Sequence, residues 1–195
     1  MTSAAQADGN GNGNPLMKKS VLPFGAPDFR IIKETDYLPA LKAGIGQQRE
    51  EIRKIVENKE KPTFKNTILA YEESGQLLGR VSSIFFGLTN ANKTPTLGKA
   101  EDEAIPLLTA LENEISFNQK FFERVKYVYD NERNSLKGED RKLLDEIYKG
   151  FVRSGALLTA DKKARMEEIN NRIAALQQDF GNMLPKATND AAVWV

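Results

Sequence analysis

Residues 159–184, TADKKARMEEINNRIAALQQDFGNML, carry the most regular helical pattern in the chain. Apolar side chains recur there at spacings of three and four residues, at Met166, Ile169, Ile173, Leu176, Phe180 and Met183. Such a repeat forms the seam along which one long helix packs against another in a helix hairpin. Thr159 is suited to cap the helix, and Pro185 is expected to end it. The stretch therefore predicts a long helix paired lengthwise with a second helix.

Five earlier segments show the same helical periodicity. They are residues 36–58, 66–88 and 96–115, the residues that follow Asn118, and the residues that follow Gly138. Asn66 is expected to cap the second helix, and Pro106 is expected to kink the third. Gly75 and Gly79, four residues apart, are expected to let a neighbouring helix approach closely. Together these segments predict an all-α fold of about six helices with long antiparallel helix hairpins.

The N-terminal residues differ in composition from the rest. Residues 1–14 are mostly Gly, Asn and Ala, and we interpret them as a disordered tail or linker because they offer almost nothing apolar to bury. They resemble the spacer after a removed signal peptide, which slightly favours an exported or periplasmic protein over a cytoplasmic one, and they equally fit a plain tail. Residues 22–29, LPFGAPDF, contain two prolines and predict an extended N-terminal arm whose apolar groups lie across a helix.

The C-terminal residues 191–195, AAVWV, form a short apolar, strand-like run. A strand needs a pairing partner, and no other segment has strand periodicity, so the run predicts an element that is truncated at Val195. The alternative is that Trp194 packs onto the helices. The expected organisation is a tail at 1–14, a helical lobe at 15–190 and the start of a further element at 191–195.

The composition excludes several kinds of chemistry. The chain has no histidine and no cysteine, so it cannot build a Ser-His-Asp triad, a thiolate nucleophile or the imidazole ligands of a catalytic zinc ion. Its 28 basic and 27 acidic residues give a net charge of +1, which argues against nucleic acid and charged membrane surfaces as partners. No apolar run approaches the roughly 20 residues that span a bilayer. We expect no catalytic, cofactor-binding or metal-binding residue in this chain.

Three groups of side chains are candidates for a site, and a structural role is the simpler interpretation for each. Neighbouring acidic residues, which point about 100° apart on a helix, are expected to be solvated and ion-paired. They lie at Glu50-Glu51, Glu72-Glu73, Glu101-Asp102-Glu103, Asp145-Glu146 and Glu167-Glu168. The cluster of Lys162, Lys163 and Arg165 is interpreted as exposed surface rather than an anion site. Phe86 and Tyr127 lie off the apolar stripes, where they either pack or line a cleft.

Several of these stretches occur together in one known family. The segments are LPFGAPDF at 22–29, DYLPA at 36–40, PTFKNTI at 62–68, ESGQLLGRV at 73–81, FFGL at 85–88, FVRSGA at 151–156, FGN at 180–182 and ATN at 187–189. In this order they resemble the N-terminal part of the peptidyl-dipeptidases, which are zinc metallopeptidases of the thimet oligopeptidase and oligopeptidase A family. The resemblance runs from about Asn14 to Val195.

The resemblance implies a mostly helical enzyme with two lobes around a deep channel that admits short peptides. It further implies a zinc ion, held by an H-E-x-x-H helix and a downstream Glu, and release of dipeptides from the substrate's C-terminus. H-E-x-x-H is absent from this sequence, so no catalytic residue is carried over. The matching segment implies helices that wall the channel.

Two interpretations remain open from the sequence. The first is an N-terminal fragment of such a peptidase, inactive alone, whose partner is the missing C-terminal catalytic lobe. The second is a free-standing helical interaction module without enzymatic activity. Apolar surface that the missing lobe covers also predicts self-association of the fragment.

Overall fold

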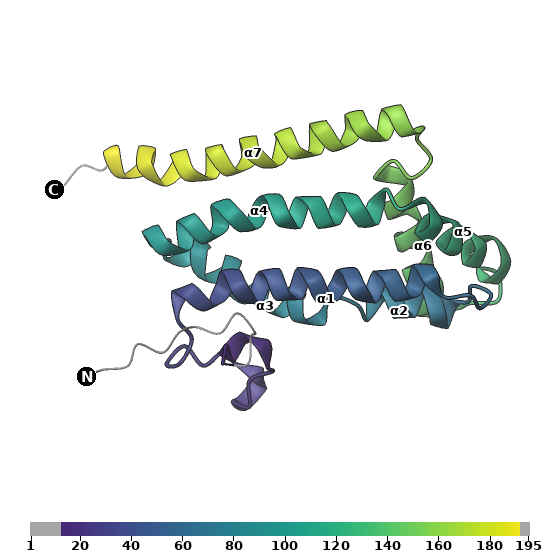
Figure 1. Cartoon of the computed structure of the whole chain (residues 1–195), viewed down its shortest axis with the longest axis horizontal. Coiled ribbons are helices and arrows are strands. Elements are labelled where there is room, and N and C mark those ends of the chain that lie inside the picture. Colours follow the sequence, from purple (N-terminus) through teal and green to yellow (C-terminus); the bar gives the residue numbers. More distant parts are fainter. Residues whose placement is uncertain (1–12, 192–195) are drawn as a thin grey trace. The chain divides into compact units, whose positions relative to one another are not determined.

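The fold of the chain is all-α, as the sequence predicts. The computed structural model describes residues 13–191, and those residues contain no strand. Six helices of at least 14 residues are α1 (Tyr37–Glu57), α3 (Gln76–Ala91), α4 (Pro95–Ser116), α5 (Gln119–Glu132), α6 (Gly138–Arg153) and α7 (Ala160–Asp190) (Figure 1). A π-helical turn at Phe64–Leu69 leads directly into the three-residue helix α2 (Ala70–Glu72).

Both chain ends fall largely outside the described residues. Of the predicted tail, only residues 13 and 14 are described, and Asn14 accepts a hydrogen bond at 2.9 Å from the Leu16 amide. Of the predicted strand-like run, only Ala191 is described, and it lies in a turn that follows α7. The remaining residues of both predictions, including Trp194, lie outside the described part.

Three predictions about the helices are wrong. The helix expected over 66–88 is broken at Gly75, whose φ of +70° lies in the left-handed region that favours glycine. Asn66 is not the cap: Thr63 is, because its Oγ1 accepts from the Asn66 amide at 3.1 Å while Asn66 Oδ1 accepts from the Thr63 amide at 2.9 Å. Pro185 does not end α7, which continues to Asp190. A proline removes one amide donor and bends a helix, but it does not force the helix to stop.

The described chain divides into two units, and each is described separately. The first combines residues 13–48 with Gly75–Ala104. Its core side chains are fully buried or nearly so and include Tyr37, Leu41, Val81, Phe85 and Leu97. The rings of Tyr37 and Phe85 lie 5.4 Å apart at their centroids. The core therefore joins the first half of α1 to α3 and the start of α4.

The N-terminal arm lies on this unit through three short 3-10 turns. Leu16, in the turn Pro15–Met17, is 3% exposed, and the Arg80 guanidinium on α3 donates to its carbonyl at 3.2 Å. The expectation that the apolar groups of residues 22–29 lie across a helix is wrong for Phe24 and Phe29, whose side chains are exposed. Phe24 also has a φ of +60°, a strained value for a residue with a large side chain.

Gly44 on α1, rather than Gly75 or Gly79, permits the close approach of a neighbouring helix. A Cβ added to Gly44 would lie 2.9 Å from the Leu78 Cα on α3, closer than real contacts allow. A Cβ on Gly79 would meet nothing within 4 Å, and one on Gly75 would meet only the Gln48 side chain. The missing side chain at Gly44 therefore sets the spacing of α1 and α3 within the first unit.

We expect Gly44→Ala to destabilise the first unit by about 1–3 kcal/mol, because the new methyl group displaces backbone rather than a flexible side chain. Gly46 is a matched control two residues away on the same helix, where an added Cβ meets nothing within 4 Å. Gly46→Ala is expected to stabilise by about 0.5–1 kcal/mol, since alanine is the better helix former. Urea unfolding followed by circular dichroism measures both. Equal effects from the two substitutions would contradict the close approach at Gly44.

The second unit combines Arg49–Ser74 with residues 105–191. Its core is an aromatic cluster between α5, α6 and the segment of the π-helical turn and α2. Phe121 is fully buried, and its ring lies 5.1 Å from the rings of both Tyr71 and Phe151, edge to face in each case. Pro106 lies inside α4, which continues to Ser116; the predicted kink there stays a prediction. The helices within residues 13–191 lack a long apolar stretch of the kind that spans a bilayer.

Candidate functional site

The described part of the chain offers no place for a metal ion. Across residues 13–191, no three His, Cys, Asp or Glu side chains gather in a way that could hold one. Ion pairs occupy several of the acidic residues considered above, among them Glu50 with Arg53, Asp145 with Arg133, Glu146 with Lys142 and Glu168 with Arg165. The hydrogen bond from Arg133 lowers the pKa of Asp145. Glu101 differs, because its side chain is 12% exposed and pairs with Lys93.

The basic cluster does not converge on one point. Lys163 donates to the Gln119 side chain at 3.1 Å, whereas Arg165 pairs with Glu168 at 2.5 Å. The two off-stripe aromatic residues have ordinary packing partners. The Phe86 ring lies 5.1 Å from that of Phe85. The Tyr127 ring lies 5.5 Å from the Lys61 ammonium, a cation–π distance.

Sequence reasoning missed a buried arginine. Arg124 on α5 is 8% exposed, and its guanidinium donates to the backbone carbonyls of Asn58 at 2.7 Å and Glu60 at 3.3 Å. It also donates to Asn66 Oδ1 at 3.2 Å and Thr67 Oγ1 at 3.4 Å. No carboxylate faces it at hydrogen-bond distance among these partners, and burial lowers its pKa. Arg124 thus holds the segment between α1 and the π-helical turn against α5, a positioning role without chemistry of its own.

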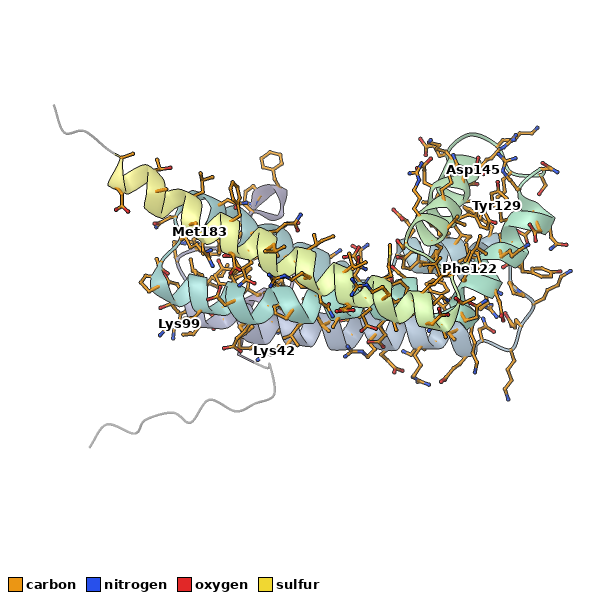
Figure 2. The ribbon with its side chains drawn as sticks, turned by 90° about the horizontal axis from the view of Figure 1, so that it is seen from above. Lys42, Lys99, Phe122, Tyr129, Asp145 and Met183 are labelled. Carbon is orange, nitrogen blue, oxygen red and sulfur yellow. The ribbon has the colours of Figure 1, made fainter. Side chains whose placement is uncertain are left out.

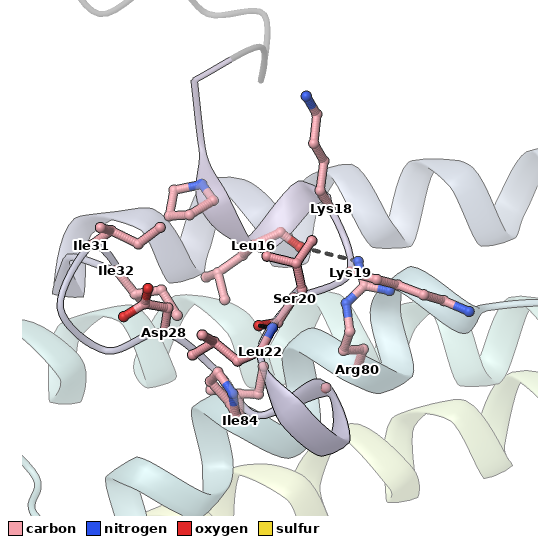
Figure 3. A pocket seen from close by; sticks show the side chains of 14 residues that line it. Leu16, Lys18, Lys19, Ser20, Leu22, Asp28, Ile31, Ile32, Arg80 and Ile84 are labelled. Carbon is pink, nitrogen blue, oxygen red and sulfur yellow. Dashed lines mark hydrogen bonds between the residues drawn. The ribbon is translucent and has the colours of Figure 1, made fainter.

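An apolar pocket of about 250 Å³ lies between the N-terminal arm and α3 in the first unit. In Figure 3, Leu16, Leu22, Ile32 and Ile84 surround it, and the dashed line marks the bond from Arg80 to the Leu16 carbonyl that fixes its wall. Its one acidic side chain, Asp28, is bound by Arg30 with two hydrogen bonds of 2.8 Å. The pocket is suited to an apolar group.

The apolar seam of α7 is the largest unexpected feature. The predicted hairpin partner does not cover it: exposures are Ile169 40%, Ile173 47%, Leu176 49%, Phe180 63% and Met183 60%. Toward α4, α7 presents a mixed face: Asn170 donates to Asn113 Oδ1 at 2.8 Å, and Met166 and Ile173 of the seam line the groove of about 360 Å³ between the two helices. Figure 2 shows side chains extending from α7 along its length, and Met183 is labelled among them. The seam is therefore available to a partner.

Comparison with known proteins identifies the relatives of the chain. No protein-family profile matches it. It is 39% identical over 176 residues to the dipeptidyl carboxypeptidase of Salmonella typhimurium, and 36% identical over 183 residues to that of Escherichia coli. These matches cover 90% and 93% of this chain. This chain is homologous to dipeptidyl carboxypeptidases. Oligopeptidase A of Escherichia coli is 25% identical over 176 residues, so the resemblance recognised in the sequence is confirmed.

The chain spans only about a quarter of the length of these dipeptidyl carboxypeptidases, 26% and 27% respectively. A match over 90% of 195 residues must include at least the central part of the chain, about residues 20–176. Arg124, the π-helical turn and the first part of the α7 seam therefore all lie in the region shared with dipeptidyl carboxypeptidases.

Proposed function

We propose that this chain is the N-terminal helical portion of a zinc metallopeptidase of the peptidyl-dipeptidase type. Such an enzyme hydrolyses short peptides and releases dipeptides from their C-terminus. The observation that carries the proposal is the 39% identity to a dipeptidyl carboxypeptidase over 90% of this chain. The residues of this chain do not fit a zinc site, since histidine and cysteine are absent from its sequence. The metal ligands and the general base belong to the length of the relatives that this chain does not cover.

The role of this portion is to wall the substrate channel. Long helices support that role: α1, α4 and α7 have 21, 22 and 31 residues. At 1.5 Å per residue these lengths correspond to roughly 30–45 Å, enough to line a channel for an extended peptide. The four hydrogen bonds of Arg124 and the close approach at Gly44 hold the helices of each unit in fixed places. Such a wall would exclude folded proteins and admit short unstructured peptides.

The partner of this portion is the catalytic remainder of the enzyme. Apolar side chains that nothing covers among residues 13–191, on the arm at Val21 and Phe24 and on α7, support a partner surface. The alternative is a free-standing helical interaction module without enzymatic activity, which the same exposed surfaces also favour. We favour the peptidase, because the chain aligns with about a quarter of the length of two dipeptidyl carboxypeptidases.

Purified chain is expected to release no dipeptide from short peptides with a free carboxyl terminus, and to hold no stoichiometric zinc after dialysis. The reason is the absence of histidine and cysteine ligands. Reverse-phase chromatography of the peptide products and elemental analysis of the protein measure the two outcomes. The full-length dipeptidyl carboxypeptidase of Escherichia coli, treated identically, is the positive control. One zinc ion per chain surviving dialysis would contradict the proposal.

A further inference from the structure

Two tyrosine side chains of the second unit are stacked ring on ring. Tyr129 on α5 and Tyr148 on α6 have ring centroids 3.9 Å apart and ring planes that differ by 13°. Most aromatic pairs in proteins keep their centroids roughly 4.5–7 Å apart, so this pair is unusually close. At this separation, ring carbons of Tyr129 lie within van der Waals distance of ring carbons of Tyr148. Both side chains are half-buried, so part of each ring meets solvent.

Side chains of the same two helices hold the stacked pair. The Arg133 guanidinium lies 5.4 Å from the centre of the Tyr129 ring, and Asp145 accepts two hydrogen bonds from it at 2.6 and 2.9 Å. The buried Phe122 ring stacks on Tyr148 with a centroid distance of 5.9 Å. Figure 2 shows Phe122, Tyr129 and Asp145 together at α5 and α6. The packing of α5 on α6 therefore sets the close approach of the two tyrosine rings.

The stacked pair differs from the other tyrosines of the chain. All five tyrosines lie within residues 13–191, and among them only Tyr129 and Tyr148 have rings that contact each other. Tyr37 and Tyr71 contact phenylalanine rings, and Tyr127 lies beside the Lys61 ammonium. Cysteine, which oxidants readily attack, is absent from the sequence. An oxidant that removes single electrons therefore meets a tyrosine pair that is already positioned for coupling.

We propose that Tyr129 and Tyr148 form an oxidative modification site, at which hydrogen peroxide and a haem peroxidase join them as dityrosine. Each side chain loses one electron and its hydroxyl proton and becomes a neutral tyrosyl radical. The two radicals couple by a carbon–carbon bond between the ring carbons ortho to the hydroxyl groups. The hydrogens on those carbons then move to the phenol oxygens. In balance, two tyrosines and one hydrogen peroxide give one dityrosine and two water molecules.

The cross-link is expected to form within one chain rather than between chains. Two groups already in contact react without the entropy cost of bringing separate molecules together. The product ties α5 covalently to α6 and restricts the unfolded chain, so it is expected to raise the urea midpoint of the second unit. The proposal rests on ring geometry within the second unit and does not depend on the peptidase function.

Oxidation of the purified chain at low micromolar concentration, with a haem peroxidase and limiting hydrogen peroxide, tests the proposal. A Trp194→Phe background removes the single tryptophan, which would otherwise compete for the oxidant. The monomer is expected to become lighter by two hydrogen atoms and to show dityrosine fluorescence. Mass spectrometry of tryptic peptides is expected to find Tyr129 joined to Tyr148. Free tyrosine in a parallel reaction shows that the oxidant is active.

Phenylalanine variants locate the cross-link, because phenylalanine keeps a stacked ring but has no hydroxyl group. Tyr129→Phe and Tyr148→Phe are each expected to lower the yield of intramolecular dityrosine about tenfold. Tyr127→Phe is the matched control: Tyr127 is a half-buried residue of the same helix beside Lys61, and its substitution is expected to leave the yield unchanged. Three results would each overturn the proposal: equal yields from Tyr129→Phe and Tyr127→Phe, dityrosine that links only separate chains, or no dityrosine while free tyrosine couples.

Discussion

Phe121→Ala is expected to lower the free energy of unfolding of the second unit by about 3–5 kcal/mol. The Phe121 side chain is fully buried, and it contacts the rings of Tyr71 and Phe151 edge to face at 5.1 Å. Truncation removes these contacts and leaves a cavity between α5, α6 and α2. Urea unfolding followed by circular dichroism at 222 nm measures the loss.

Phe24→Ala is the matched control for Phe121→Ala. The Phe24 side chain on the N-terminal arm is fully exposed, at 108% relative to a reference residue. Its removal is expected to change the free energy of unfolding by less than about 0.5 kcal/mol. If Phe121→Ala and Phe24→Ala shifted the unfolding midpoint equally, the aromatic cluster would not be the core of the second unit.

Arg124→Met is expected to destabilise the second unit by about 2–4 kcal/mol. The substitution removes the charged donor of the unsubstituted chain and leaves its buried acceptors without a hydrogen bond. The methionine side chain is also long and unbranched, so it fills much of the space that the arginine side chain occupies. The loss of stability therefore reports mainly on the hydrogen bonds to Asn58, Glu60, Asn66 and Thr67. Arg124→Lys is expected to recover part of the loss, since a single ammonium keeps the charge but not the planar fork.

The control for Arg124→Met is Arg141→Met on the exposed surface of α6, expected to stay within about 0.5 kcal/mol of the unsubstituted chain. Urea unfolding measures all three variants. If Arg124→Met were as stable as the unsubstituted chain, other contacts would hold the segment between α1 and the π-helical turn.

The helices that the sequence predicts best are those with regular apolar stripes. Helix α1 begins and ends within one residue of the predicted 36–58, and α4 within one residue of 96–115. Prediction of helix boundaries fails where the backbone conformation of a few residues interrupts the helical spacing of the apolar side chains. Gly75 takes a left-handed φ that interrupts an otherwise continuous apolar stripe, and the capping box of Thr63 and Asn66 starts a π-helical turn that periodicity does not reveal.

Arg124 was missed because a charged residue in a helical pattern is ordinarily assigned to the surface. A signal was nevertheless present. Arg124 lies three residues after Phe121 and four residues before Val128, so it falls on the same face of α5 as these buried residues. A cation on an apolar face needs several buried acceptors, and the turn-rich segment around residues 58–67 contains them.

The seam of α7 shows a different limit. Its spacing predicts a long helix with an apolar face, and α7 is that helix. Periodicity says that a face is apolar, but it does not say which element covers it. Among the described residues α7 places Asn170 against α4, where it donates to the Asn113 amide oxygen, and only Met166 and Ile173 of the seam line the groove beside this bond.

We propose that this chain is one lobe of a zinc peptidase whose catalytic residues lie elsewhere in the same polypeptide. Sequencing the source reading frame past the codon for Val195 tests it most directly. We predict that the frame continues and encodes an H-E-x-x-H segment, which supplies two zinc ligands and the general base of the relatives' chemistry. A stop codon immediately after Val195 would contradict the claim and leave the helical interaction module as the function of the chain.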